Sequence, residues 1–179
     1  MCHITTHLST FSEIVAQHVT KASVIYTNTP FANMYPQRRG LLFEDIGRKL
    51  DPHVTVKPHK MPGRSRASYD WLRPNEMQRV ECKSAQLSWN KSGWVLHFKN
   101  IKVLEFDILM LCFYTPNSLL YFECEVSDLN SLYSQGALMS GGQCMVLRGG
   151  KCDWEIAAAS IRVKLNSIAT KTACVNLDA

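Results

Sequence analysis

The chain has 179 residues, 46% of them hydrophobic and 20% charged, which excludes a wholly disordered protein and leaves enough length to close one hydrophobic core. The formal net charge of +5 is compatible with a polyanionic partner, although many proteins without one carry as much. Seven cysteines form no CxxC pair and no cysteine–histidine spacing typical of zinc, so they indicate reduced, mostly buried thiols in an intracellular protein. We expect a soluble protein with no membrane partner, because the N-terminus lacks the plan of a secretory signal and the longest apolar stretch, Phe106–Tyr114, is too short to span a bilayer.

The N-terminal part of the sequence predicts two helices with a loop between them. Thr10 and Glu13 form a capping box at the start of an amphipathic helix over about 10–20. The segment Tyr26–Pro36 contains two prolines and two asparagines, which favour a loop. A second helix is expected over Gly40–Leu50. Its inward stripe is predicted to consist of Leu42, Ile46 and Leu50.

A basic loop is expected next, over Asp51–Ser68. The segment has three prolines and little periodicity, so it should be exposed and mobile. Its basic residues are Lys57, Lys60, Arg64 and Arg66. They are our candidates for binding nucleic-acid phosphates, and the alternative is an ordinary solvent-exposed loop.

From residue 69 onward the sequence predicts a run of strands. The expected strands are Tyr69–Leu72, Arg79–Leu87, Trp94–Ile101, Phe106–Tyr114 and Leu119–Val126. Turn residues separate them at Arg73–Glu76, Asn90–Gly93 and Pro116–Ser118. Trp89 and Trp94 flank one of these turns and are expected to pack as a cross-strand aromatic pair.

The C-terminal part predicts turns and a last helix. The glycine-rich segments SGGQ and RGGK are expected to be turns, although Arg148 and Lys151 with their glycines could approach a DNA backbone. A helix is expected to begin after Asp153, with Trp154, Ala158, Ile161, Leu165 and Ile168 facing inward. The whole pattern predicts an α/β (α+β mixed) fold, a single domain over 1–179 with a central mixed sheet flanked by helices.

Asp70, Glu81 and Lys83 are the residues that point to chemistry. Side chains alternate along a strand, so Glu81 and Lys83 should share one face while Val80 and Cys82 share the other. Asp70 lies at the start of the preceding strand, and if the two strands pair, the three charged side chains can converge at one edge of the sheet. Two close carboxylates cannot cheaply both stay ionised without a cation, and Mg²⁺ is a hard ion that prefers such oxygens. Bound metal activates water and neutralises charge developing on a phosphate.

Asp70 followed by Glu81-Cys82-Lys83 resembles the motif of the PD-(D/E)XK nuclease superfamily, which includes many type II restriction endonucleases. Glu44, on the preceding helix, is similar to an acidic residue that such enzymes often carry. The resemblance covers about residues 40–126 in order of elements. The sequence departs from the motif at Tyr69, where the family name has proline, a position that varies within the superfamily.

The resemblance implies a restriction-endonuclease-like fold and Mg²⁺-dependent hydrolysis of DNA phosphodiesters, with Mn²⁺ as a substitute. It implies a metal held by Asp70, Glu81 and the backbone carbonyl of Cys82, with Lys83 orienting the attacking water and Glu44 as a further catalytic residue. Sequence-specific cleavage of double-stranded DNA, of restriction or homing type, is the form we expect. Cutting two strands usually takes two active sites, so a homodimer is expected.

Several alternatives stay open at the level of sequence. Glu81 and Lys83 could form the solvated face of an edge strand, paired by i, i+2 contact. Asp70 could be a turn or cap residue, and Asp45 could take the place of Glu44. For the whole protein, the alternatives are a non-catalytic DNA-binding domain of the same fold and a structure-specific or RNA nuclease.

Overall fold

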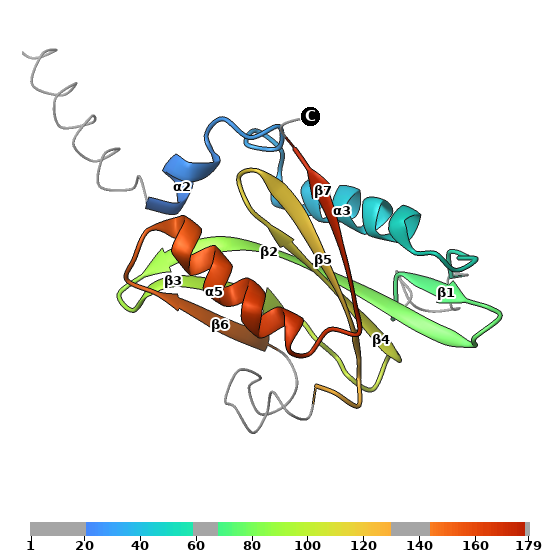
Figure 1. The fold of residues 1–179 in the computed structure, drawn as a ribbon. Coiled ribbons are helices and arrows are strands. Elements are labelled where there is room, and N and C mark those ends of the chain that lie inside the picture. The colour runs from blue at the N-terminus through green and yellow to red at the C-terminus, as the bar shows by residue number, and fades with distance from the viewer. Residues whose placement is uncertain (1–20, 59–67, 130–143, 178–179) are drawn as a thin grey trace, which may run out of the picture.

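Seven strands form one mixed sheet in the part of the chain that the computed structural model describes, residues 21–58, 68–129 and 144–177 (Figure 1). The strand order is β6-β3-β2-β4-β5-β7, and β1 pairs with β2 beside this path. β2 and β4 are parallel, and every other described pair is antiparallel. The expected α/β fold with a central mixed sheet is therefore confirmed. The helix expected over about 10–20 lies outside the described residues.

The described helices are α2 (Lys21–Tyr26), α3 (Pro36–Leu50) and α5 (Trp154–Asn166). The strands are β1 (Trp71–Arg73), β2 (Gln78–Asn90), β3 (Gly93–Lys99), β4 (Ile108–Tyr114), β5 (Ser118–Glu125), β6 (Cys144–Gly150) and β7 (Lys171–Asn176). None of the described helices is long and apolar enough to cross a membrane. Residues of α2, α3, α5 and all the longer strands contribute to one hydrophobic core.

α3 packs closely on one face of the sheet. It begins at Pro36, four residues earlier than expected, because proline suits the first turn of a helix, where its missing N–H is not needed. Phe43 and Gly47 are buried, and a Cβ built on Gly47 would lie 3.0 Å from a ring carbon of Tyr121, so the glycine lets the helix approach the sheet. The predicted inward stripe is right for Leu42 and Ile46, which pack against the core. It is wrong for Leu50, which is 38% exposed.

β2 is the central strand of the sheet and positions the candidate site. β4 pairs with one edge of β2 over residues 80–86. On the other edge, β1 pairs with residues 78–80 and β3 with residues 87–90. Between these two partners, residues 81–86 have no described strand on that edge. We call this stretch the open edge of β2.

Tyr26 extends the β2–β4 ladder beyond the end of β4. Its hydroxyl donates to the carbonyl oxygen of Tyr114 at 2.8 Å and accepts from the amide of Leu87 at 3.0 Å. The two tyrosine rings are also in contact, with centroids 4.8 Å apart. One buried side chain thus satisfies backbone groups of both strands and joins α2 to the sheet.

α5 covers the opposite face, over β3 and β6 (Figure 1). A Cβ built on Gly149 would lie 2.6 Å from the Cβ of Ala157, so this glycine permits close contact between helix and strand. The expectation that RGGK forms turns is therefore wrong for Arg148–Gly150, which belong to β6, and SGGQ lies outside the described residues. The last helix is confirmed. Its inward residues include Ala158, Ile161 and Leu165, followed by buried Ile168.

The expected tryptophan pair is confirmed. Trp89 and Trp94 face each other across the β2–β3 ladder, with ring centroids 5.1 Å apart in an edge-to-face arrangement. The prediction of buried, unpaired thiols is also confirmed for Cys82, Cys112 and Cys124. By contrast, Cys144 and Cys152 are half-buried and Cys174 is exposed.

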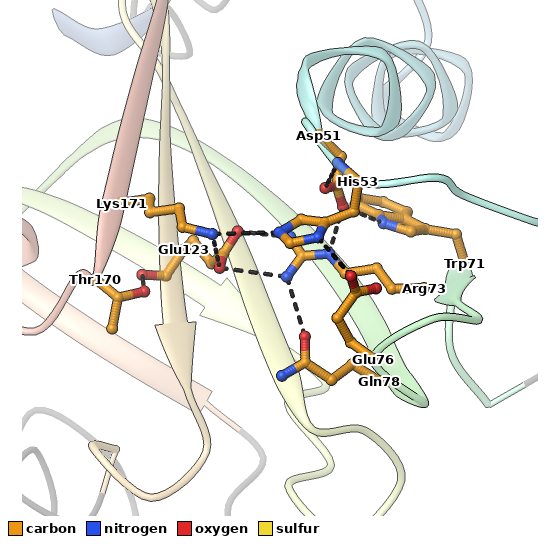
Figure 2. Close-up of polar contacts among 9 residues, drawn as sticks. All are labelled: Asp51, His53, Trp71, Arg73, Glu76, Gln78, Glu123, Thr170 and Lys171. Atoms are coloured by element: carbon orange, nitrogen blue, oxygen red, sulfur yellow. Dashed lines mark hydrogen bonds and ion pairs between the residues drawn. The ribbon is translucent and has the colours of Figure 1, made fainter.

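A buried ionic network anchors β1 (Figure 2). Arg73 is 1% exposed, and its guanidinium donates to Asp51 at 2.7 Å and to Glu123 at 2.6 Å. The indole of Trp71 donates to the same Asp51 oxygen at 2.9 Å. Asp51 is therefore buried, which corrects the expectation that the loop after α3 is exposed from its first residue. The network links the end of α3 to β1 and β5.

His53 and Lys171 extend this network toward the surface (Figure 2). A ring nitrogen of His53 lies 3.0 Å from Glu76 in the β1–β2 turn. Its other ring nitrogen lies 3.3 Å from the ammonium of Lys171 on β7, which also approaches Glu123 at 3.5 Å. Asp51 is thus paired with Arg73, and Glu123 with both Arg73 and Lys171. We infer that this network has a structural role and holds β1 in place directly after Asp70.

Candidate active site

Asp70 lies just before β1 and closes part of the open edge of β2. Its amide donates to the carbonyl oxygen of Val80 at 2.9 Å. Its carboxylate accepts a hydrogen bond from the amide of Cys82 at 2.7 Å. Asp70 is thus tied to β2 by both backbone and side chain, and the predicted pairing of the two strands brings it beside the Glu81–Lys83 segment.

Glu81 and Lys83 lie on β2 and form an ion pair. The contact between residues i and i+2 agrees with the alternative of a structural pair, whereas the burial of Glu81 contradicts the solvated face that this alternative also assumed. Glu81 is only 8% exposed, and β2 is paired with β4 along this stretch. Val80 and Cys82, on the alternate positions, are buried in the core as expected.

The electrostatics of Glu81 depend on Asp70. The pKa of Glu81 is raised to about 7, chiefly by burial and then by the charge of Asp70 and a hydrogen bond with its carboxyl, while Lys83 acts in the opposite direction. The two carboxyl groups therefore compete for negative charge, as expected for close carboxylates without a cation. The single ammonium of Lys83 offsets only part of this repulsion.

Glu44 belongs to the same electrostatic cluster. Burial raises the pKa of this α3 carboxyl to about 7, and the charge of Asp70 is the next largest cause, while Glu81 adds a smaller contribution in the same direction. Its neighbour Asp45 behaves differently. Asp45 is held by Lys57 at 3.1 Å and by Arg48 at 3.7 Å, and the Lys57 hydrogen bond lowers its pKa. Of the two acids, Glu44 is therefore the one coupled to the site.

Of the four basic residues expected to bind phosphates, only Lys57 lies in the described residues. Its ammonium is exposed and already pairs with Asp45, so any phosphate would share it with this carboxylate. Lys60, Arg64 and Arg66 lie outside the described residues.

The carboxylate and carbonyl oxygens at this edge of β2 are of the kind that bind a hard divalent cation. Within the described ranges, no group of three or more histidine, cysteine, aspartate or glutamate side chains is arranged to hold a metal. Mg²⁺ does not require such a cage, because it keeps several waters and binds through one or two carboxylates together with substrate phosphates. Asp70 and Glu81 supply two carboxylates within hydrogen-bond reach of each other. The N–H and C=O of one strand residue point to the same edge, so the Cys82 carbonyl joins them there.

The other reactive side chains of the core do not form a second site. Burial raises the pKa of the Cys112 thiol to about 12 and that of the Cys124 thiol to about 12. Such thiols stay protonated, and the thiolate is the form that attacks substrates or binds metals. The carboxylate cluster around Asp70 is therefore the stronger candidate for chemistry.

Comparisons with known proteins did not identify a similar protein. No family model matches the chain, and neither the curated proteins nor the solved structures gave a significant match. The assignment of function therefore depends on the geometry of the cluster and on the motif.

Proposed function

We propose that this chain is a Mg²⁺-dependent endonuclease that hydrolyses DNA phosphodiester bonds, with Mn²⁺ able to replace Mg²⁺. One observation carries the proposal: Asp70, Glu81 and Lys83 lie together at the open edge of a central strand, Glu44 is electrostatically coupled to both carboxyls, and the pKa values of Glu44 and Glu81 are raised to about 7. A purely structural cluster would be matched in charge, as the Arg73 network is. Here the negative charge exceeds the positive charge, which favours a bound cation.

The roles of the residues follow from their positions. Asp70, Glu81 and the Cys82 carbonyl would hold the cation at the β2 edge. The bound ion lowers the pKa of coordinated water and neutralises charge on the scissile phosphate. Lys83 already contacts Glu81, so its ammonium is placed to donate a hydrogen bond to the attacking water and to orient it. Glu44 would hold a proton near neutral pH, which places a proton donor or acceptor beside the site.

Double-stranded DNA and a homodimer are part of the proposal. The formal charge of +5 supports a polyanionic substrate. A nuclease with one site per chain cuts both strands of a duplex most simply as a dimer with two-fold symmetry, since DNA strands are related by the same symmetry. We propose sequence-specific cleavage as the preferred form, which would appear as discrete fragments.

The test is incubation of the purified full-length protein with supercoiled plasmid, single-stranded DNA or RNA, each with Mg²⁺, Mn²⁺ or a chelator. The proposal predicts cleavage of the plasmid that requires a divalent ion. Cleavage of RNA but not of DNA would contradict the substrate, and cleavage that persists in chelator would contradict the metal dependence. Binding of duplex without cleavage of plasmids of several sequences would favour the non-catalytic DNA-binding domain.

A further inference from the structure

Of the described helices, α5 is the one that packs along β3 and β6, and it lies on one side of them. Gly149 faces α5, and the strand registers place Leu147, Leu96 and Leu87 on that same side. Alternate residues must therefore point to the other side. We call this surface the β2–β3–β6 face. Its members are Gln86, Ser88, Val95, His97, Lys99, Cys144, Val146 and Arg148.

This face is basic and contains no acid. Residues 84–90 of β2, all of β3 and all of β6 include no aspartate or glutamate on either side of the sheet. Lys99 and Arg148 are both exposed, and neither forms an ion pair with any residue in the described ranges. Two cations on neighbouring strands that carry no aspartate or glutamate form a surface that is complementary to a phosphate backbone.

Two polar side chains on the same face have atoms without partners. The Gln86 side-chain oxygen and the His97 Nε2 are buried, and neither has a hydrogen-bond partner among the residues that the structure describes. The β2–β3 ladder ends at Leu87 and Leu96, so Gln86 and His97 are the next residues on the two strands and lie on the same side of the sheet. A buried polar atom left without a partner typically costs about 1–3 kcal/mol. Because both side chains are only half-buried, rotation of their terminal groups can bring these atoms to a ligand.

We propose that the β2–β3–β6 face binds duplex DNA, with Lys99 and Arg148 on phosphates and with Gln86 and His97 hydrogen-bonded to the nucleic acid. The inference rests on the proposed function, because it names the surface on which the substrate of the Asp70–Glu81 site lies. Gln86 follows Lys83 by three residues on β2, and a strand rises about 3.3 Å per residue, so face and site are about 10 Å apart along the strand. Glu81 and Lys83 have the same parity as Leu87, so their side chains lie on the α5 side of the sheet. A duplex on the β2–β3–β6 face would therefore reach the site across the open edge of β2, where Asp70 contacts Cys82.

The test measures binding apart from cleavage. Fluorescence anisotropy of a short labelled duplex is recorded with the full-length protein in chelator, across salt concentrations from about 50 to about 200 mM. Lys99→Gln and Arg148→Gln are each compared with Arg162→Gln, which makes the same change of charge on exposed α5, across the sheet. Each face variant should weaken binding and reduce the slope of log affinity against log salt by about one, while Arg162→Gln should leave both unchanged.

Gln86→Met distinguishes a role of Gln86 in DNA binding from a role in stabilising the fold. The change keeps the shape of the side chain and removes the unpartnered oxygen, so the thermal stability of the free protein should be maintained or rise. The affinity for duplex should nevertheless fall. A variant that binds duplex as tightly as the wild type would overturn the role of Gln86.

The outcomes separate this inference from the proposed function. Lys99→Gln and Arg148→Gln proteins that bind as tightly as Arg162→Gln would overturn the inference, even if the wild type cleaves plasmid with Mg²⁺. Absence of duplex binding by the wild type, or binding of RNA in preference to DNA, would also overturn it. A wild type that binds duplex through Lys99 and Arg148 but never cleaves would support the inference and contradict the nuclease proposal.

Discussion

The Asp70 carboxylate accepts a hydrogen bond from the amide of Cys82 at 2.7 Å, across the edge of β2 that β1 and β3 leave open. This contact places a charged side chain where a neighbouring strand would otherwise pair. It fixes Asp70 close enough to the carboxyls of Glu81 and Glu44 for its charge to raise the pKa of both. The geometry of the candidate site therefore depends on the backbone of the same strand that carries Glu81 and Lys83.

Asp70→Asn should separate the charge of Asp70 from its structural contact. The amide oxygen of asparagine can still accept from the Cys82 amide, so the free energy of unfolding should change by less than about 1 kcal/mol. Loss of the charge removes one metal ligand and lowers the pKa of Glu81. Calorimetric titration with Mn²⁺ should show affinity reduced by at least about tenfold. Unchanged Mn²⁺ affinity in a folded variant would remove Asp70 from the site.

Metal binding should strengthen as pH rises from about 6 to about 8. Ligands must lose their protons before they bind, and the carboxyls of Glu81 and Glu44 have pKa values raised to about 7. Each carboxyl that gives up a proton should contribute up to about tenfold in apparent affinity over this range. Calorimetry with Mg²⁺ at the two pH values measures the change. Equal affinities at both pH values would show that Glu81 is not a ligand.

The same raised pKa values have the opposite effect on the protein without metal. A carboxyl whose pKa is higher in the folded state binds its proton more tightly there, so its contribution to stability is present at low pH. That contribution is lost as pH rises from about 4.5 through about 7. In chelator, the thermal stability of the protein should therefore fall as pH rises over this range. Added Mg²⁺ should make this fall in stability smaller.

Glu44→Gln and Asp45→Asn form a matched pair on α3. Glu44 is coupled to Asp70 and Glu81, whereas Asp45 pairs with Lys57 and Arg48 at the surface. Glu44→Gln should reduce the rate of plasmid cleavage by about ten- to a hundredfold, and Asp45→Asn should leave it nearly unchanged. Equal rates for the two variants, measured under single-turnover conditions, would show that Glu44 is a structural residue.

Arg73→Met should destabilise the fold by about 3–5 kcal/mol, because it leaves buried Asp51 without a cation and Glu123 with Lys171 alone. Arg79→Met is the control. Arg79 pairs with Asp107 at the surface, where both side chains are 40% exposed, and its loss should cost less than about 1 kcal/mol. Urea unfolding measures both values. A similar cost for the two variants would mean that the Arg73 network does not lock β1 in place.

Sequence patterns predicted the central elements because their burial follows simple periodicities. The strands between residues 69 and 126 were predicted within a few residues of their observed ends, and the last helix was predicted with its inward face. β7 was not predicted. Only Ala173 and Val175 of this edge strand are half-buried, and the apolar but exposed Cys174 lies between them, so the sequence shows no clear alternation of apolar and polar side chains. Arg148–Gly150 were misassigned because Gly149 serves close packing against α5 and not a turn.

For the candidate site, the sequence supplied the residues but not their contacts. The order of Glu44, Asp70, Glu81 and Lys83 along the chain was sufficient to group them. The hydrogen bond from Cys82 to Asp70 and the choice between Glu44 and Asp45 needed the three-dimensional packing. The Arg73 network could not be foreseen either, because its acidic partners lie 22 and 50 residues away in the chain.

The most direct test of the central claim is cleavage of supercoiled plasmid with Mg²⁺ by the wild type, Lys83→Gln and Lys102→Gln. Lys102 is an exposed lysine that pairs with Glu105, so its variant makes the same change of charge away from the site. We predict discrete fragments from the wild type and Lys102→Gln, and a rate about 10²- to 10⁴-fold lower for Lys83→Gln, the usual range for loss of a group that assists proton transfer. Equal cleavage by all three proteins would contradict the account.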